Sequence, residues 1–456
     1  MGGTVRVAVH QGQEDLGVNG TVLVEPTAPA VAARPAPLPR GRIVLWTLTF
    51  VYVINFLDRS LLGILAKPIQ DDLHVTDGQL GLIGGLYFAV FYCFIAIPVG
   101  WLADRTSRVG VLSLACALWS AATTFCGLAA NYTQLVLARM LVGVGEAGGV
   151  PPSYALITDY YPPGRRGLAF GVYNLGPPIG VALGIAFGAS IAAAFDWRAA
   201  FIAMGAIGIV AAVAVRLIVR EPPRGTFDRA KTADLGRAGF WETVKAFFSN
   251  PLLMLAAIGS GSTQFITYGL GNFTSLFLMR EKGMTLQEVA VWYALVAGLG
   301  MSVGMLVSGR AIDTFVQRSR AYYAIIPACS LTLAIPLYLA FVWSPGWALS
   351  LVFLLGVMAL NYFYLSSAIA LVQEEVRPDQ RVMAGALLLL VMNFMGLGLG
   401  PTYVGAASDY FHSLGYARPL QTALYTLTPA YVIAILLFLW LARRLKAEAQ
   451  TQGTAS

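Results

Sequence analysis

The chain has 456 residues, of which 57% are hydrophobic and only 12% are charged, about half the charged fraction of an ordinary soluble domain. This composition argues against a water-soluble enzyme. The net charge of +7 does not indicate a nucleic-acid partner, because the basic residues neither cluster nor alternate with exposed aromatic residues.

Residues 1–40 form a polar segment that becomes rich in proline and alanine. This segment has no short apolar core followed by a cleavage site, so it does not resemble a signal peptide. We expect a disordered cytoplasmic tail here, and a second short cytoplasmic tail at residues 446–456.

Twelve apolar runs of membrane-spanning length follow between residues 43 and 442. Their approximate ranges are 43–66, 79–102, 109–129, 133–156, 167–190, 198–219, 251–279, 287–309, 322–342, 346–371, 381–405 and 422–442. The sequence therefore predicts an all-α polytopic membrane protein with 12 transmembrane helices, embedded in the lipid bilayer.

The basic residues predict the orientation of these spans. If the N-terminus is inside, the cytoplasmic segments hold 21 Lys and Arg residues and the opposite side holds five. This asymmetry places both termini in the cytoplasm. We expect a multi-pass protein of the plasma or inner membrane.

The longest connection between spans, residues 221–250, divides the chain into two halves. Its last part, from Phe240 to Phe248, has apolar residues at helical spacing and predicts an interfacial helix. The connection separates a six-helix bundle at 41–220 from a second six-helix bundle at 251–445.

The two halves resemble each other at corresponding positions. A Gly-x-x-x-Asp pattern follows the second span at residues 100–104 and the eighth at residues 309–313. A Gly-Pro pair lies in the fifth span at residues 176–177 and in the eleventh at residues 400–401. Proline removes a backbone donor, so both pairs predict kinks.

Four ionisable residues lie deep inside apolar runs: Asp58 and Arg59 in the first span, Arg139 and Glu146 in the fourth. Such charges are costly in hydrocarbon and need partners. At ~1.5 Å per residue, Asp58 and Arg139 both lie roughly 20 Å from the cytoplasmic edge, so we expect them to pair. Glu146 follows Arg139 by seven residues and shares its helix face.

The functional hypothesis assigns proton coupling to Asp58, Glu146 and Arg139. The two carboxyl groups bind protons, Arg139 moves between them as a shared counter-ion, and Arg59 attracts an anionic substrate head. Movement of an arginine relative to a buried carboxyl group changes how strongly that group holds a proton. The alternative is a permanent ion-pair cluster that only holds two helices together.

A second charged group lies at the predicted cytoplasmic ends of the helices. Five of these residues form the predicted cytoplasmic gate: four belong to the first half, and one lies at the corresponding position of the second half. Three further charges of the second half lie at the same predicted side. The gate residues are Asp104, Arg105, Arg108, Asp159 and Asp313; the accompanying charges are Arg318, Glu374 and Glu375. Ion pairs among them would latch the two halves together on the inside. The alternative is that they only determine topology.

The second half has no ionisable residue well inside a span, but its spans contain amides and aromatic residues. We expect the substrate to contact polar and aromatic side chains near the bilayer midplane in both halves. The predicted substrate-binding residues are Arg59, Arg139, Glu146, Tyr173, Asn174, Gln264, Tyr268, Asn272, Asn361, Tyr362 and Asn393. For any single aromatic residue, helix packing or lipid contact is the alternative.

Other chemistries find no support in the sequence. The three histidines are far apart and the four cysteines lack metal-ligand spacing, so no metal site is expected. No Gly-rich nucleotide loop ending in Lys-Ser or Lys-Thr is present. We expect no catalytic residues and no cofactor, with a proton gradient as the energy source.

Three motifs resemble those of the major facilitator superfamily, and the resemblance covers residues 40 to 445. They are Gly100-Trp-Leu-Ala-Asp104-Arg105-Thr-Ser-Arg108, Arg139-Met-Leu-Val-Gly143-Val-Gly145 and Gly171-Val-Tyr-Asn-Leu-Gly176-Pro177-Pro-Ile-Gly180. The resemblance implies two pseudo-symmetric six-helix halves that work by alternating access.

A narrower resemblance is to the Spinster family. It rests on Asn55-Phe-Leu-Asp58-Arg59, Gly143-Val-Gly145-Glu146-Ala and Tyr161-Pro-Pro-Gly-Arg165-Arg166-Gly. It implies proton-coupled transport of a lysolipid or sphingoid-phosphate-like substrate by a monomer. Some organic-acid symporters share the Gly-Glu-Ala run, so a small organic-anion:proton symporter is an alternative. A transport-dead sensor or a polytopic membrane enzyme is a more distant one.

Overall fold

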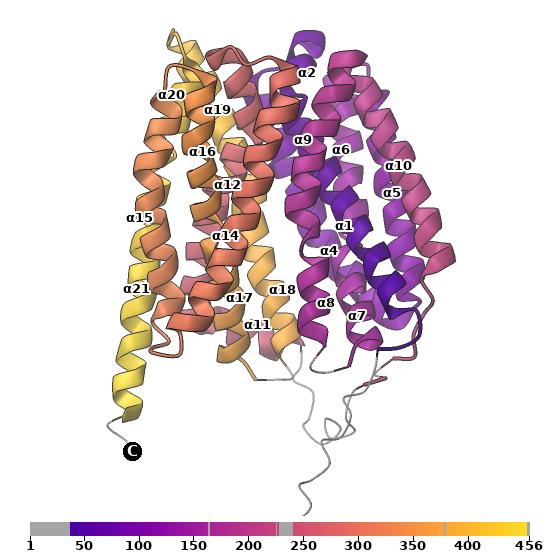
Figure 1. Ribbon diagram of the computed structural model, residues 1–456, viewed down its shortest axis with the longest axis vertical. Helices are drawn as coiled ribbons and strands as arrows, with labels where there is room; N and C mark the ends of the chain where they lie inside the picture. Colours follow the sequence, from indigo (N-terminus) through magenta and orange to yellow (C-terminus); the bar gives the residue numbers. More distant parts are fainter. Residues whose placement is uncertain (1–36, 163–164, 225, 228–239, 378–379, 454–456) are drawn as a thin grey trace, which may run out of the picture. The chain divides into compact units, whose positions relative to one another are not determined.

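The structure is a computed structural model that describes residues 37–162, 165–224, 226–227, 240–377 and 380–453. Most of the predicted N-terminal tail therefore lies outside the described residues. Within them, every regular element is a helix, and the helices pack side by side along one direction (Figure 1). The all-α prediction is confirmed.

The first half contains ten helices, several of which join end to end to form one span. They are α1 (Gly41–Ile64), α2 (Ala66–Leu73), α3 (Asp77–Gly84), α4 (Leu86–Arg105), α5 (Arg108–Gly127), α6 (Tyr132–Glu146), α7 (Val150–Tyr160), α8 (Arg166–Tyr173), α9 (Gly176–Ala194) and α10 (Trp197–Ile218).

The second half follows the connecting helix α11 (Phe240–Ser249) and includes two π-helical segments. Its elements are α12 (Pro251–Lys282), α13 (Leu286–Glu288), η2 (Val289–Tyr293), α14 (Ala294–Phe315), α15 (Tyr322–Trp343), α16 (Trp347–Asn361), α17 (Phe363–Glu375), α18 (Arg381–Asn393), η3 (Phe394–Leu399), α19 (Gly400–Ser413), α20 (Pro419–Tyr425) and α21 (Thr428–Gly453). Because α21 extends to Gly453, most of the segment predicted as a C-terminal tail is helical.

The twelve predicted spans each correspond to a helix or to helices joined end to end. Ten of these are long and apolar enough to cross a membrane, and α12 is an eleventh that meets α11 at a bend of 79°. The remaining span, α6 with α7, contains the charged Arg139 and Glu146 and is broken by a turn at residues 147–149. A twelve-helix architecture accounts for all of them.

A helix, α11, lies where the sequence predicted an interfacial helix. Its Trp241 is 77% exposed while Phe247 is only 1% exposed, so the helix has one apolar contact face and one open face. Asn250 then ends α11 and caps α12 by accepting hydrogen bonds from the backbone N–H groups of Leu252 and Leu253.

The helices are interrupted where the Gly-Pro pairs predicted kinks. The fifth span breaks between α8 and α9, just before Gly176-Pro177, and the eleventh passes through η3 immediately before Gly400-Pro401. Proline cannot donate the backbone hydrogen bond that a continuous α-helix requires, which accounts for both positions.

Close contact between α1 and α9 positions the charged part of the first span. Gly176, Gly180, Gly184 and Gly188 recur every four residues on α9 and all face α1. A Cβ atom at Gly180 would lie 2.5 Å from the carbonyl oxygen of Val53. The small glycine surface therefore brings the two backbones together beside Asp58 and Arg59.

Two ends of this bundle need names. We call the end that carries α11 and the C-terminal end of α21 the terminal end, and the end that carries α2 and α20 the far end (Figure 1). The described N-terminal residues also lie at the terminal end, where the backbone N–H of Leu38 bonds to the carbonyl of Tyr160 at the end of α7.

The glycine contact predicts a position-specific effect on stability. Gly180→Ala is expected to lower the free energy of unfolding by about 1–3 kcal/mol, because the added methyl group overpacks the α1–α9 contact. The measurement is the thermal unfolding midpoint of the purified protein. Gly171→Ala is the matched control, since a Cβ atom there meets nothing within 4 Å; equal effects at both positions would contradict the packing argument.

Candidate functional site

Arg59 on α1 and Glu146 on α6 form a buried ion pair. The Arg59 Nε atom lies 2.6 Å from Glu146 Oε2, and the two side chains are 10% and 0% exposed. Gly145 places α6 against α5, because a Cβ atom there would lie 2.5 Å from the backbone nitrogen of Trp119. This tight helix contact holds Glu146 inside the bundle.

Asp58 and Arg139 form a second, looser pair, as their matching depths predicted. Arg139 Nη1 lies 3.9 Å from Asp58 Oδ1, and both side chains are almost fully buried. Thr123 on α5 donates a hydrogen bond of 2.5 Å to Asp58 Oδ2. Three spans of the first half therefore meet at one carboxyl group.

The expected shared counter-ion is not formed in this conformation. Glu146 contacts Arg59, the residue next to Asp58, while Arg139 contacts Asp58. The Arg59 side chain extends from α1 to Glu146 on α6, so Glu146 is paired without Arg139. The four charges make two separate pairs.

Several polar atoms of this cluster are buried without a hydrogen-bond partner among the described residues. They are Asp58 Oδ1, Arg139 Nε, Arg139 Nη1 and Glu146 Oε1. Buried polar atoms normally find partners, and leaving one unpaired costs about 1–3 kcal/mol or more when charged. The cluster therefore has hydrogen-bonding capacity that the described residues leave unused.

Aromatic rings enclose both arginines. The Arg59 guanidinium carbon lies 5.1 Å from the ring centroid of Phe56, 5.4 Å from that of Phe88 and 4.6 Å from that of Tyr92. Arg139 lies 5.2 Å from the centroid of the same Phe88 ring. Cation–π attraction thus compensates part of the desolvation of both cations.

Tyr268 on α12 brings the second half to the cluster, because it interacts with Arg59. Sequence reasoning selected Tyr268 but missed Thr123, Phe88 and Tyr92. Threonine and aromatic residues are common in membrane helices, so these three carried no signal of their own. Only their position opposite the rare charged residues distinguishes them.

The other predicted substrate residues of the first half lie in an aromatic group. Tyr173 stacks on Tyr52 with ring centroids 4.4 Å apart and meets Tyr154 edge to face. Asn174 accepts a hydrogen bond of 3.0 Å from the Tyr154 hydroxyl. Tyr173 is fully buried, so it shapes the site through Tyr52 and Tyr154 and presents no free surface itself.

The predicted residues of the second half separate into different environments. Gln264 donates a 3.4 Å hydrogen bond to Asn393 between α12 and α18, and Tyr362 is half-buried. Asn272 donates to the carbonyl oxygen of Tyr268 and packs against Gly84 of the first half. Asn272 therefore contributes to the contact between the halves.

Asn361 does not fit the predicted substrate-binding role. Its amide nitrogen donates to the Tyr431 hydroxyl at 2.9 Å, its amide oxygen lies 3.2 Å from the same hydroxyl, and the side chain is buried. An amide at membrane depth needs a partner, and α21 supplies one within the same half. The structure assigns Asn361 to helix packing.

The predicted cytoplasmic gate is also different from expectation. Arg108 and Asp159 form a buried ion pair, but both belong to the first half. Arg105 lies over the Trp101 ring at 3.9 Å, and the Asp104 side chain lies outside what the structure describes. Asp313 at the repeat position is exposed.

In the second half, Arg320 rather than Arg318 pairs with the acids. It lies 2.7 Å from Glu375 and 3.7 Å from Glu374, and all three residues belong to the second half. Arg318 lies instead near the Phe315 ring. Among the predicted gate residues, Arg108 and Asp159 thus link two spans of the first half, and the Arg320 pairs link spans of the second half.

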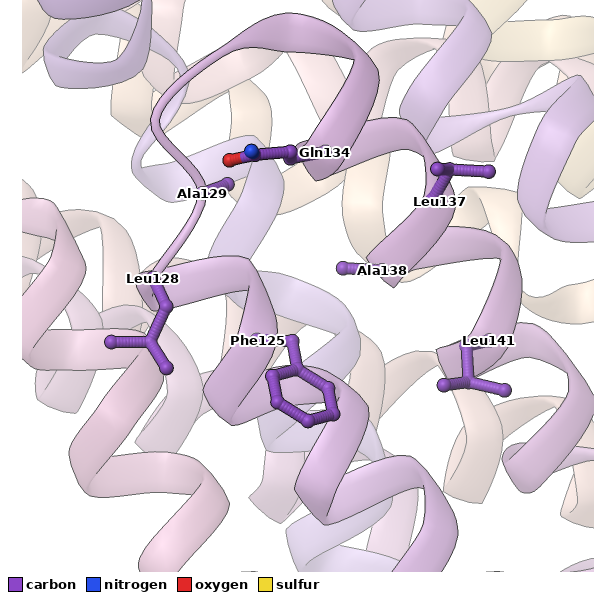
Figure 2. Close-up of a pocket in the computed structure, with 7 residues that line it drawn as sticks. All are labelled: Phe125, Leu128, Ala129, Gln134, Leu137, Ala138 and Leu141. Atoms are coloured by element: carbon purple, nitrogen blue, oxygen red, sulfur yellow. The ribbon is translucent and has the colours of Figure 1, made fainter.

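One surface groove lies between the far ends of α5 and α6 (Figure 2). It has a volume of about 330 Å³, and its lining is apolar except for Gln134. Phe125 and Leu137 in this lining are more than half exposed. In a membrane-spanning bundle such a surface faces lipid, so we do not include it in the charged site.

A two-part bundle of membrane-spanning helices with paired charges buried in its interior is typical of membrane transporters. Comparison with known proteins supports this class. The chain matches the family model of the Major Facilitator Superfamily over residues 48–401. A crystal structure of a bacterial homologue of the human lysosomal transporter Spinster, in an inward-facing and unoccupied conformation, superposes with a TM-score of 0.83 at 31% identity, covering 90% of this chain and 98% of that one.

Three further relatives are also similar to this chain over most of its length. An MFS-type efflux pump of Mycolicibacterium smegmatis is 32% identical over 88% of this chain and 92% of its own length. Protein spinster homolog 1 of Xenopus tropicalis is 26% identical over 89% and 82%. A hexuronate transporter of Bacillus subtilis is 26% identical over 80% and 87%.

The chain belongs to the Spinster family of the major facilitator superfamily. It is a multi-pass membrane transporter and not an enzyme.

The Arg59–Glu146 pair predicts strong coupling between two substitutions. Glu146→Gln or Arg59→Gln alone is expected to lower the free energy of unfolding by about 3–5 kcal/mol, because each leaves a buried charge unpaired. The double variant should recover most of this loss. The thermal unfolding midpoint measures it.

The pair Lys67–Asp71 serves as the control, because its side chains are 32% and 61% exposed and surface ion pairs contribute only about 0–1 kcal/mol. Additive losses in the Arg59/Glu146 double variant would show that the two residues do not act as a pair.

Proposed function

We propose that the protein is a proton-coupled secondary transporter that moves an amphipathic, anionic, lysolipid-like substrate by alternating access. The observation that carries the proposal is the buried cluster of two acids and two arginines on α1 and α6. Membrane-buried acids whose partners can be exchanged are typical of proton relays. No cofactor is required, because the proton gradient supplies the energy.

Glu146 is the proposed link between proton and substrate. Its carboxylate lies within ion-pair distance of Arg59. When Glu146 takes up a proton, it no longer neutralises Arg59, and the guanidinium becomes available to an anionic head group. Binding of that head group in turn favours the protonated acid, so proton and substrate occupancy depend on each other.

Asp58 is the proposed second proton site. Arg139 and the Thr123 hydroxyl both stabilise its ionised form. Because these partners come from α6 and α5, a shift of either helix relative to α1 changes how strongly Asp58 holds a proton. This relation connects proton binding to helix movement.

The aromatic surroundings of Arg59 support an amphipathic substrate. Phe56, Phe88 and Tyr92 provide apolar surface directly beside the guanidinium, and Tyr268 comes from the second half, whose spans have no deeply placed charges. A charged head at Arg59 and an apolar chain along α12 and its neighbours fit this division.

A small organic anion is the second candidate, because a hexuronate transporter is among the relatives and an arginine also binds a carboxylate. For the orientation, the excess of basic residues supports a cytoplasmic terminal end. We propose a monomer with both termini inside, in the plasma or inner membrane.

A reconstitution experiment distinguishes the substrates. Purified protein in liposomes with an imposed pH gradient is expected to transport lysolipids or sphingoid phosphates, and to transport them faster than without the gradient. Small organic acids are tested in parallel. Gradient-driven uptake of acids with no lipid movement would overturn the lipid proposal, and gradient-independent transport would overturn proton coupling.

Substitution of the two acids tests the proton mechanism. Asp58→Asn and Glu146→Gln are expected to reduce gradient-driven transport at least 100-fold, because the amide cannot carry a proton between the two sides. Transport is divided by the amount of folded protein, since Glu146→Gln also removes the Arg59 ion pair. Asp72→Asn, at a half-exposed acid on α2, is the control and should behave like the parent. Parental coupling in both test variants would exclude the mechanism.

A further inference from the structure

The two halves are joined by polar contacts at the far end. Asp77, the first residue of α3, accepts two hydrogen bonds from Arg280 near the end of α12, at 2.9 and 2.7 Å. The Ser408 hydroxyl on α19 donates to the same carboxylate at 2.5 Å. Asp77 belongs to the first half, whereas Arg280 and Ser408 belong to the second.

Asp77 is buried, so these contacts differ from an ordinary surface ion pair. Its side chain is 6% exposed, against 28% for Arg280. Gln70 of α2 supplies a further hydrogen bond of 2.6 Å. A bidentate arginine and two neutral donors satisfy the carboxylate, and charge-assisted bonds of this kind are stronger than neutral ones.

The rest of α3 continues the same contact. Asp409 of α19 accepts a hydrogen bond of 2.9 Å from the backbone N–H of Gly78, at the positive end of the helix. The helix backbones approach so closely that a Cβ atom at Gly81 would lie 2.5 Å from the carbonyl oxygen of Pro401. The α3–α19 contact thus leaves no space between these two helices, which belong to different halves.

The segment α3 is a separate unit of its span. It begins at a capping box formed by Thr76 and Gln79, and it ends at Gly85, where the backbone leaves the helical conformation. The N–H of Leu86, at the start of α4, bonds instead to the Thr402 hydroxyl of α19 at 3.1 Å. The second half therefore provides the hydrogen-bond acceptor for a backbone N–H group at the break in this span of the first half.

We propose that α3, held to Arg280, Ser408, Asp409 and Thr402, is the lock that closes the far end of the transporter. Opening of the far end requires the Asp77–Arg280 bonds to break, and loss of either partner shifts the conformational equilibrium toward a far-end-open state. This inference concerns the closure of one end and holds whichever substrate or ion is transported.

Another arginine–aspartate pair at the far end provides a matched control. Arg198 of α10 lies 2.5 Å from Asp72 of α2, but both residues belong to the first half. Breaking this more exposed pair also removes an arginine–aspartate contact at the far end, but one that lies within a single half. It should leave the closure unchanged.

The reporter for far-end opening is Ser275→Cys on α12. The Ser275 side chain is fully buried and its hydroxyl bonds to the Ile64 carbonyl of the first half at 3.4 Å. The four native cysteines, Cys93, Cys116, Cys126 and Cys329, are replaced by alanine. The rate of reaction with a positively charged methanethiosulfonate reagent is measured in lipid nanodiscs, in which both faces are accessible.

The reporter is expected to react slowly in the parent and at least tenfold faster in Asp77→Asn and Arg280→Gln, with Ser408→Ala in between. Arg198→Gln should match the parent. A second reporter, Ser413→Cys at an exposed position, checks that the reactivity of the reagent is the same in every variant. Arg280→Gln leaves Asp77 its bonds to Ser408 and Gln70, so this variant decides the question if Asp77→Asn fails to fold. Equal rates in the parent and Arg280→Gln, or an equal increase in Arg198→Gln, would overturn the lock.

Discussion

The interaction on which the structure depends is the pairing of charges that the bilayer would otherwise make too costly. Two acids and two arginines lie inside helices that cross an apolar medium, where an isolated charge costs several kcal/mol. Four helices pack closely around them, because glycines on α9 allow close approach to α1 and Gly145 on α6 allows close approach to α5. Without these contacts, α1 and α6 could not bring Arg59 within 2.6 Å of Glu146.

Much of the fold follows from the sequence, because the thickness of the bilayer sets the length of each span. Hydropathy alone predicted the spans, and the rare buried charges predicted the position of the site. The partners in the site were harder to predict. Spacing along the helices did not show which arginine meets Glu146, and the three-dimensional placement pairs it with Arg59 and leaves Arg139 beside Asp58. Thr123, Phe88 and Tyr92 belong to residue types that are frequent in any membrane helix. Asn361 is a polar residue in an apolar span, as a binding residue would be, although its side chain bonds to Tyr431 in the helix packing.

The distribution of ion pairs between the ends of the bundle shows a related limit. Helix-end charges such as Arg108 and Asp159 were expected to join the halves, yet they connect helices of one half. The contacts between the halves involve Asp77 and Arg280 at the other end. A protein that works by alternating access must be able to close at either end. A sequence motif does not show which of the two ends is closed in a given conformation. The family relationship has the same limit, since one chain adopts several states.

The Phe88 ring has a consequence for how the two carboxyl groups respond. Its ring centroid lies 5.4 Å from the guanidinium carbon of Arg59 and 5.2 Å from that of Arg139. A ring can offer its face to two cations only in a narrow range of orientations. When one arginine changes partner, the ring must turn, and the environment of the other arginine changes with it. Phe88 thereby connects the Arg59–Glu146 pair with the Arg139–Asp58 pair, so a rearrangement of one ion pair alters the surroundings of the other.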